Sequence, residues 1–329
     1  MQVGNLITKN LSIVGRKEDR TSNRAGKDLY LGGRLLSMGG TNMPWSPPST
    51  NNIEYLSIGH GGNAVDFGEM ARAGRYKPGT CTGYGTRAVT NGGGPGSPPT
   101  GGWLSYEVQS VLIPGGSAVD GFGTEATNTQ RALPCSNGYR GFWCGGQGYP
   151  SSTINDQIQF LNIQTGGTSV DIGENGMGTA SAAVEETACG DGSRGMIMYT
   201  GFPQSDHVRY FNMGHHTGTA TDWGERTSSS GDNDCAAGSG RYIVFGQYGG
   251  SPGIDSGNIM STGSAVQHGH EATKPNGNNC DGDGNRCVAV SGENAEQLVQ
   301  YCNFVTPGNA VDFGDPYQAR VYHNGTSGA

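Results

Sequence analysis

The sequence predicts an all-β fold, a six-bladed β-propeller built from four-stranded blades. Three observations predict it. A hairpin-like segment that opens its second strand with arginine recurs six times, and an alternating strand that leads into an Asp-aromatic-Gly turn follows it. In addition, the two ends of the chain carry complementary parts of one repeat.

The hairpin segment is clearest at residues 135–146, which read Cys-Ser-Asn-Gly-Tyr-Arg-Gly-Phe-Trp-Cys-Gly-Gly. Asn-Gly between two strand-like runs favours a hairpin, because both residues tolerate the positive φ of a tight turn. By subtraction, successive arginines lie 53, 53, 54, 47 and 45 residues apart. They are Arg34, Arg87, Arg140, Arg194, Arg241 and Arg286. A cysteine precedes five of them, and we assign the sixth equivalent position to His323; the cysteines are Cys81, Cys135, Cys189, Cys235 and Cys280.

The second signature is an alternating strand of the type Ile-x-Tyr-x-x-Ile that leads into an Asp-aromatic-Gly turn. The strand copies are residues 53–58, 108–113, 158–163, 208–213 and 299–304, and the copy in the fifth repeat, near residues 257–260, is degenerate. The turn copies contain Asp66, Asp120, Asp171, Asp222 and Asp312, and the fifth repeat has Gln267-His268-Gly269 instead. These aspartates are expected to bond their own backbone two residues on, as turn residues do.

Each repeat therefore has four candidate strands in roughly 45–50 residues, which is the length of one propeller blade in the WD40 and kelch classes. The last copy stops after its cysteine-type strand, in Tyr322-His323-Asn324-Gly325, and the first copy begins at its arginine strand, with Arg34. We expect these two strands to pair and to close the ring, which removes an exposed sheet edge.

Two regions follow from this reading: an N-terminal arm at residues 1–26, and the propeller at residues 27–329. The arm lacks the repeat pattern and has the polar, charged composition of a solvated tail. The alternative, which we favour, is an arm that docks on a partner.

Composition narrows the classes of function. Charged residues are 15% of the 329 and the net charge is −8, which disfavours sequence-independent nucleic-acid binding and an anionic membrane surface. No run approaches the roughly 20 apolar residues of a spanning helix. The N-terminal residues lack the pattern of a signal peptide, so synthesis in the cytoplasm is expected.

The repeated arginines are interpreted as structural, with each guanidinium bonding free carbonyls or a turn aspartate. The alternative is a positive ring at one channel mouth that binds an anionic glycan or phosphate.

The repeated cysteines are interpreted as small packing residues. Cys280 and Cys287 flank a turn, and either a disulfide or two free thiols fit there. Residues 281–285, Asp-Gly-Asp-Gly-Asn, resemble a calcium loop but lack its downstream Glu, so a turn is favoured.

Motifs that carry chemistry are not found. His215-His216 and His268-Gly269-His270 are the only histidine clusters, and surface positions are expected for them. The sequence has no phosphate loop and no paired His-Glu metalloprotease motif. We therefore predict no enzyme, no cofactor and no catalytic or metal residues.

The repeats nevertheless resemble a known type. The Gly-Gly that ends the second strand, followed by a strand with an aromatic residue, looks like the kelch-type propeller. The full pattern of hairpin, alternating strand and Asp-Phe-Gly turn resembles repeats in virion structural proteins of tailed bacteriophages, over residues 30–329. The resemblance implies a propeller on the surface of a phage particle, as a tail, fibre or head-surface component.

The sequence reading leaves three hypotheses. The first is a non-enzymatic virion protein that is held to other virion proteins through residues 1–26. The second is a glycan-binding module that contacts a host surface glycan through loop aromatic residues. Its candidate contacts are Trp45, Trp103, Tyr149 and Tyr248. The third is a propeller enzyme, such as a lyase or an oxidase, that acts on polysaccharide.

Overall fold

A computed structural model describes these residues of the chain: 33–42, 50–71, 80–83, 86–91, 107–116, 118–127, 129–130, 132–148, 154–176, 187–198, 206–214, 218–227, 235–238, 241–245, 253–272, 279–291, 297–321 and 323–328. Within these ranges every regular element is a β-strand. No helix in this part of the chain is long and apolar enough to cross a membrane.

Four of the sheets are antiparallel and four-stranded, and we name each blade by its innermost strand. The β29 blade contains β29 (Asn324–Gly328), β1 (Arg34–Met38), β3 (Asn52–Ser57) and β4 (Val65–Glu69). The β15 blade contains β15 (Thr187–Gly190), β16 (Arg194–Met198), β17 (His207–Asn212) and β19 (Thr221–Glu225). The β20 blade contains β20 (Cys235–Gly238), β21 (Arg241–Phe245), β22 (Gly253–Asn258) and β23 (Val266–His270). The β24 blade contains β24 (Asn279–Gly282), β25 (Arg286–Ser291), β26 (Leu298–Asn303) and β27 (Val311–Gly314).

The fifth large sheet has nine strands and holds two antiparallel runs of four. The β5 run contains β5 (Thr80–Gly83), β6 (Arg87–Asn91), β7 (Glu107–Leu112) and β8 (Val119–Thr124). The β10 run contains β10 (Leu133–Ser136), β11 (Arg140–Cys144), β13 (Gln157–Asn162) and β14 (Gly166–Glu174), and β18 (Gly218–Thr219) pairs with β14. Two small pairs complete the fold: β9 (Thr129–Gln130) with β12 (Gln147–Gly148), and β2 (Thr41–Asn42) with β28 (Arg320–Val321).

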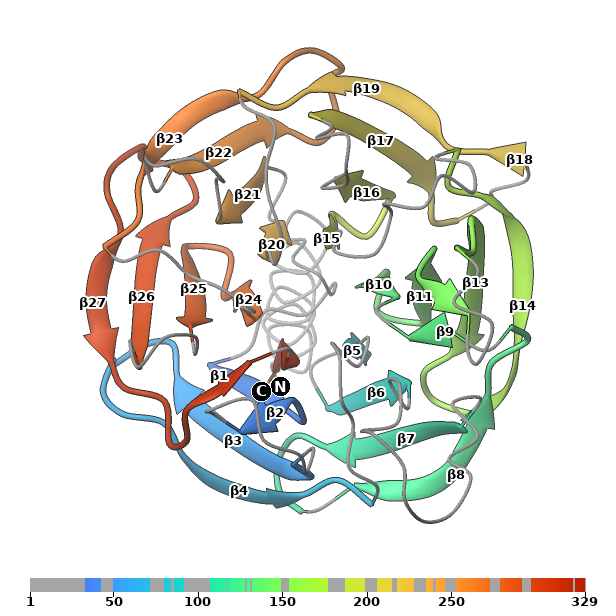
Figure 1. The fold of residues 1–329 in the computed structure, drawn as a ribbon, viewed down its shortest axis with the longest axis horizontal. Coiled ribbons are helices and arrows are strands. Elements are labelled where there is room, and N and C mark those ends of the chain that lie inside the picture. Colours follow the sequence, from blue (N-terminus) through green and yellow to red (C-terminus); the bar gives the residue numbers. More distant parts are fainter. Residues whose placement is uncertain are drawn as a thin grey trace, which may run out of the picture.

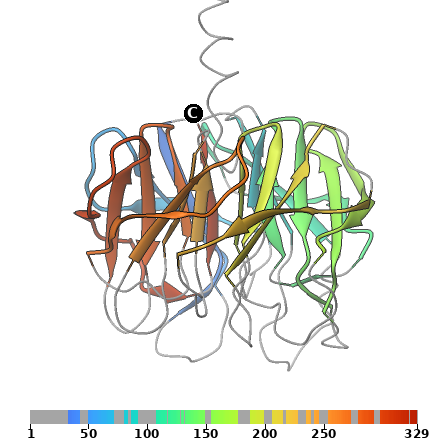
Figure 2. The same cartoon turned by 90° about the horizontal axis from the view of Figure 1, so that it is seen from above.

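The sheets are arranged around an axis with their short first strands innermost (Figure 1). Seen from the side, the inner strands run along this axis while outer strands such as β19 and β23 cross it obliquely (Figure 2). The predicted all-β, propeller-like arrangement of four-stranded blades is therefore observed. The separation into six independent sheets is not, because a parallel pairing of Gly167 and Thr168 with Gly123 and Thr124 joins β14 to β8.

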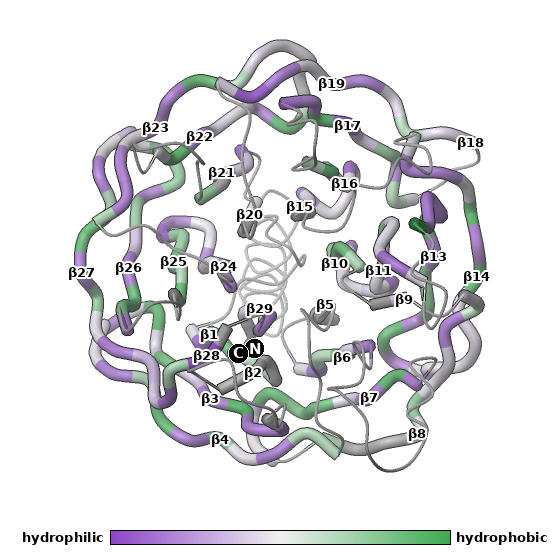
Figure 3. The backbone as a smooth tube through the Cα atoms, in the orientation of Figure 1, coloured by the Kyte–Doolittle hydropathy of each residue, from purple (hydrophilic) through white to green (hydrophobic). Residues whose placement is uncertain are grey.

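The core lies between neighbouring sheets rather than along the axis. The arginine strands are apolar on both faces, because each face packs against a different neighbour. In β1, Leu35 joins a cluster with Val288 of the β24 blade, and the adjacent Leu36 joins a cluster with Ala88 of the β5 run. Along the outer strands β4, β14 and β27, by contrast, hydrophobic and hydrophilic residues alternate (Figure 3).

A belt of backbone hydrogen bonds links the outermost strands. The amide of Gly62 donates to the carbonyl of Phe313 at 2.8 Å, and Gly263 bonds Trp223 in the same way at 2.9 Å. A glycine next to the accepting carbonyl of such a bond has no room for a side chain. A Cβ on Gly269, for example, would lie 2.0 Å from the Gly308 oxygen. Close backbone approach between sheets explains why glycine recurs in the outer strands.

The two ends of the described chain meet in one blade. Strand β29 pairs with β1 in antiparallel register, from Arg34 opposite Gly328 to Met38 opposite Asn324. This is the pairing of C-terminal and N-terminal strands that the complementary part-repeats predict.

Candidate functional site

The repeated arginines lie between neighbouring sheets. In four cases, the guanidinium donates from the second strand of one unit to a carbonyl oxygen at the end of the third strand of the next. The pairs are Arg34 to Ile113 at 3.1 Å, Arg140 to Gly214 at 3.3 Å, Arg194 to Ile259 at 3.0 Å and Arg286 to Ile58 at 2.8 Å. The acceptors are carbonyls and not the turn aspartates, and this geometry gives the arginines a role in holding sheets together.

Aromatic rings complete the setting of these arginines. Where the fourth residue of the third strand is aromatic, the guanidinium lies over its ring, as cation–π contacts do. The pairs are Arg34 over Tyr55 at 5.2 Å, Arg140 over Phe160 at 4.4 Å, Arg194 over Tyr210 at 4.4 Å and Arg286 over Tyr301 at 5.3 Å. Where the position is serine, the guanidinium bonds the hydroxyl instead: Arg87 with Ser110 and Arg241 with Ser256, each at 3.3 Å.

The cysteine positions are only partly equivalent, so the prediction that all five cysteines occupy one repeat position is wrong. Cys81, Cys135 and Cys189 each lie opposite the residue two positions after the repeated arginine. Cys235 lies opposite Phe245, four positions after its arginine, and Cys280 lies opposite Ala289, three positions after.

His323 is likewise not the sixth equivalent. It precedes β29, and Thr326 occupies the register position opposite Leu36, two residues after Arg34. The His323 ring is buried and its Nδ1 lies 2.8 Å from the Ser37 hydroxyl. His323 therefore lies beside the pairing of β29 with β1 and does not occupy the repeat position.

Three thiols lie together in the β24 blade, and the imidazole of His268, from β23 of the β20 blade, contacts one of them. Cys280, Cys287 and Cys302 are buried free thiols, so no disulfide joins Cys280 to Cys287. The hydrogen bond from Cys287, and secondly that from His268, hold the pKa of Cys302 below its ordinary value, whereas burial raises the pKa of Cys287. His268 is buried, contrary to the expected surface position, and contacts the Ser256 hydroxyl and the Asn303 carbonyl. His270 is exposed, and His215 and His216 lie outside the described residues.

The calcium-like stretch is a hairpin turn. Asp283 Oδ1 accepts hydrogen bonds from the backbone amides of Asn285 and Arg286, both at 2.8 Å. Asp281 points elsewhere: its Oδ2 accepts from the Ser327 amide at 2.8 Å. The two carboxylates do not converge on a common point.

The outer-strand aspartates bond their own turns as expected. Asp66, Asp171 and Asp312 accept a hydrogen bond from the glycine amide two residues on, at 3.1, 2.9 and 3.0 Å. Asp222 is exposed at the same position of β19, and the side chain of Asp120 lies outside the described residues.

A second repeated polar position was missed in the sequence. The third residue of the third strand is polar, and in five of its six copies it is buried: Glu54, Gln109, Gln159, Asp255 and Gln300, with Arg209 half-buried. Gln159 Oε1 accepts from the Ala126 amide at 3.2 Å, and Gln300 Oε1 accepts from the Ala272 amide at 2.8 Å. Each donor belongs to the segment that follows the outer strand of the preceding four-stranded unit, β8 for Ala126 and β23 for Ala272. The signal was the polar x of Ile-x-Tyr, which is unusual for a strand buried on both faces.

The same position takes part in joining the two ends of the described chain. Glu54 forms a buried ion pair with Arg320 at 2.7 Å, and its Oε2 accepts from the Tyr317 amide at 2.9 Å. Arg320 also donates to the carbonyls of Gly39 and Asn52, at 2.8 and 3.0 Å. We call these five residues the seam cluster. They fix the C-terminal segment to the β29 blade just before β29.

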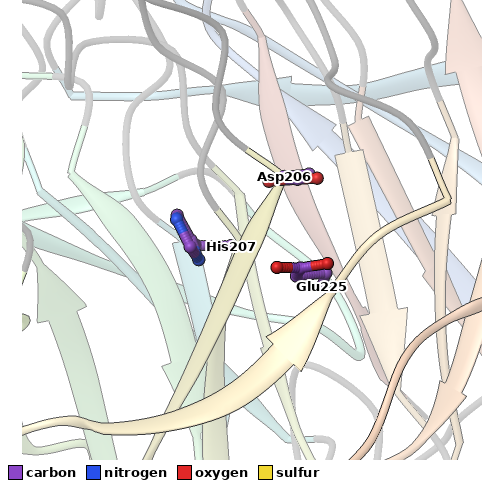
Figure 4. A group of neighbouring side chains, drawn as sticks. All are labelled: Asp206, His207 and Glu225. Carbon is purple, nitrogen blue, oxygen red and sulfur yellow. The ribbon is translucent and has the colours of Figure 1, made fainter.

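One group of potential metal ligands lies in the described part of the chain: Asp206, His207 and Glu225. Their ligand atoms all lie within 4.8 Å of one another, Asp206 is half-buried, and His207 and Glu225 are exposed. His207 opens β17 and lies directly opposite Glu225, the last residue of β19. Figure 4 shows the three side chains grouped at the ends of these two strands. This group was not predicted from the sequence, because no other histidine adjoins His207 in the chain and Glu225 is 18 residues away.

Several predicted features lie outside the described residues. The arm at residues 1–26 is one, and the candidate glycan contacts Trp45, Trp103, Tyr149 and Tyr248 are the others.

Comparisons with known proteins bear on the fold. No family model matches the chain, and no curated protein is similar to it. Among solved structures, a chain of the nidogen/laminin complex is similar, with a TM-score of 0.58 and 11% identity over 90% of this chain and 99% of that chain. At so low an identity the likeness shows the fold alone, and that fold is a β-propeller.

Proposed function

We propose that the chain is a closed six-bladed propeller that serves as a non-enzymatic structural component on the surface of a phage particle. The count of six rests on treating the β5 and β10 runs as two blades. Their link, Gly123 with Gly167, joins the same repeat positions as Gly173 with Gly218, which join the β10 run to the neighbouring β15 blade. A link that recurs between separate blades is a junction and not an internal part of one sheet.

Closure is supported by the contacts of the innermost strands. Each of β5, β10, β15, β20, β24 and β29 contacts the next, and β29 contacts β5. Electron-microscopic class averages of the purified chain test the count. Six lobes around one axis are expected, whereas five lobes, seven lobes or an open arc would refute closure at six.

The structural role is supported by the positions of the hydrogen-bond and ion-pair partners of the buried charged and amide side chains. Four of the six repeated arginines, the buried third-strand residues Glu54, Asp255 and Gln300, and the seam cluster bond from one blade to the next, which makes the ring a stiff scaffold. The virion assignment rests on the resemblance of the repeats to those of phage structural proteins. Residues 1–26 would then bind other virion proteins.

Removal of residues 2–26 tests the attachment. We expect the truncated chain to fold but to be lost from purified particles when it replaces the full chain. A matched variant with the arm sequence scrambled separates sequence-specific docking from arm length. Incorporation of the truncated chain at the normal level would refute anchoring by the arm, and absence of the full chain from particles would refute the virion assignment.

A host surface glycan is the second candidate partner, because Trp45, Trp103, Tyr149 and Tyr248 offer aromatic faces for sugar rings. A glycan array with the wild-type chain and a Trp45→Ala/Trp103→Ala double variant tests it. Binding that is lost in the double variant supports the glycan role, and no binding by the wild type refutes it. Turnover of any polysaccharide by the purified chain would overturn the non-enzymatic assignment.

A further inference from the structure

The group formed by Asp206, His207 and Glu225 offers two carboxylates and one imidazole from two paired strands (Figure 4). We propose that these residues bind a divalent transition-metal ion of the zinc type. The proposal goes beyond the structural role of the chain, which requires no metal.

The donor set selects the class of ion. Calcium and magnesium prefer sites made of oxygen ligands alone, whereas imidazole nitrogen suits zinc and related first-row ions. Zinc is commonly held by His, Asp and Glu in tetrahedral geometry, and three protein ligands leave one position for water. The ion would therefore bind as an exchangeable surface ion with an open position.

The backbone already holds the ligands in place. His207 and Glu225 are directly opposite in the β17–β19 ladder. The amide of Arg226 donates to the Asp206 carbonyl at 2.7 Å, which fixes the residue before β17 to the residue after β19. Metal–ligand bonds of about 2.1 Å place tetrahedral donors roughly 3.4 Å apart. The donors lie within 4.8 Å of one another, so side-chain rotation of the two exposed residues completes the approach.

The β10 run provides an internal comparison. Asp156, Gln157 and Glu174 occupy the same three positions there: Gln157 lies opposite Glu174, and the Asn175 amide donates to the Asp156 carbonyl at 2.5 Å. Both carboxylates and the backbone clamp are conserved between the two sites within this chain. The imidazole of His207 is the difference, and it is the ligand that confers preference for zinc over calcium.

Calorimetric titration of the full-length chain with zinc chloride tests the proposal, with calcium chloride as the second arm. We expect one zinc equivalent per chain, no calcium binding at this site, and a rise in Tm with zinc, since a ligand that binds only the folded state stabilises it. His207→Gln gives the three site positions of the β15 blade the same residue types as the corresponding positions of the β10 run. This variant is expected to lose both the bound zinc ion and the rise in Tm. Gln157→His is expected to add a second equivalent.

A His215→Gln/His216→Gln variant controls for the other histidine pair, and is expected to bind zinc like the wild type. The proposal is overturned if the wild type binds no zinc, if His207→Gln binds it unchanged, or if loss occurs only in the His215/His216 variant. Because the readouts are binding and Tm, the result is independent of the virion assignment.

Discussion

Glu125 is a single carboxyl group enclosed between β6 and the segment after β8. It is 3% exposed, and it accepts hydrogen bonds from Asn91 Nδ2 at 2.8 Å and from the Thr129 amide at 3.3 Å. Burial raises the pKa of Glu125 from 4.5 to about 8, although these hydrogen bonds lower it. Between these two values the folded chain keeps a proton that the unfolded chain has released.

The stability of the fold should therefore fall as pH rises from 4.5 towards 8. The slope is at most about 1.4 kcal/mol per pH unit. Glu125→Gln removes the group that titrates, so it should flatten this slope and raise the free energy of unfolding near neutral pH by about 1–3 kcal/mol. Urea unfolding across this pH range measures both effects. Glu69→Gln, at an exposed position, is the control, and parallel curves for wild type and Glu125→Gln would contradict the argument.

Residue identity was easier to predict from sequence than residue register. The turn role of Asp66 follows from its neighbours alone, and the structure has that hydrogen bond. The predicted equivalence of the cysteine positions was wrong because the number of residues in the hairpin turn varies from one repeat to the next. Cys81 and Cys280 both precede the arginine of their repeat by six residues. Cys81 nevertheless lies opposite the residue two positions after its arginine, whereas Cys280 lies opposite the residue three positions after its arginine. A slip of one residue turns a side chain to the opposite face of a sheet.

At the scale of elements, the outer strands depend on close backbone contact. Gly269 lies in β23 with ordinary backbone geometry, and a Cβ there would lie 2.0 Å from the Gly308 oxygen. Because that oxygen is backbone, relief requires the β23–β27 junction to open. The junction includes the hydrogen bond from the Gly308 amide to the His268 carbonyl at 2.8 Å.

Gly269→Ala should therefore destabilise the fold by about 1–3 kcal/mol, as overpacking does. Gly59→Ala is the matched control, since nothing lies within 4 Å of its added Cβ, and it should be close to neutral. Chemical denaturation of both variants provides the measurement. Equal stabilities for the two variants would mean that the belt between outer strands contributes nothing.

The second strand of each repeat and the third strand of five of the six repeats could be predicted from sequence, because their side chains are apolar or alternate between apolar and polar. The belt could not, because it consists of backbone hydrogen bonds between sheets and leaves no side-chain pattern. Glycine marked it, but in a chain with 60 glycines that mark was ambiguous. The group of Asp206, His207 and Glu225 could not be predicted from sequence for a related reason. His207 and Glu225 become neighbours only through strand register.

At the scale of the whole molecule, the first and last strands of the described chain pair in one blade. The part-repeats at the two ends predicted the pairing of β29 with β1, and the structure has it. The seam cluster behind that pairing was not predicted, since Arg320 belongs to no repeat position. The pairing of β29 with β1 spans only five residues, so we assign the retention of β29 to the buried ion pair of Arg320 with Glu54.

Arg320→Met should destabilise the fold by about 3–5 kcal/mol, because it leaves the Glu54 carboxylate buried without its partner. The Arg320→Met/Glu54→Met double variant should recover part of the loss, which a double-mutant cycle measures. Arg226→Met is the matched control, since it breaks a buried pair with Asp255 away from the seam.

Hydrogen exchange separates the two variants. In Arg320→Met, the amides of β29 and β1 should exchange first, whereas in Arg226→Met those of β19 and β22 should do so, because each pair holds only its own boundary. Exchange in β29 that stays at the wild-type rate would show that the ring is closed without the seam cluster. Exchange that accelerates evenly over every blade would show that closure is a property of the whole ring and not of one boundary.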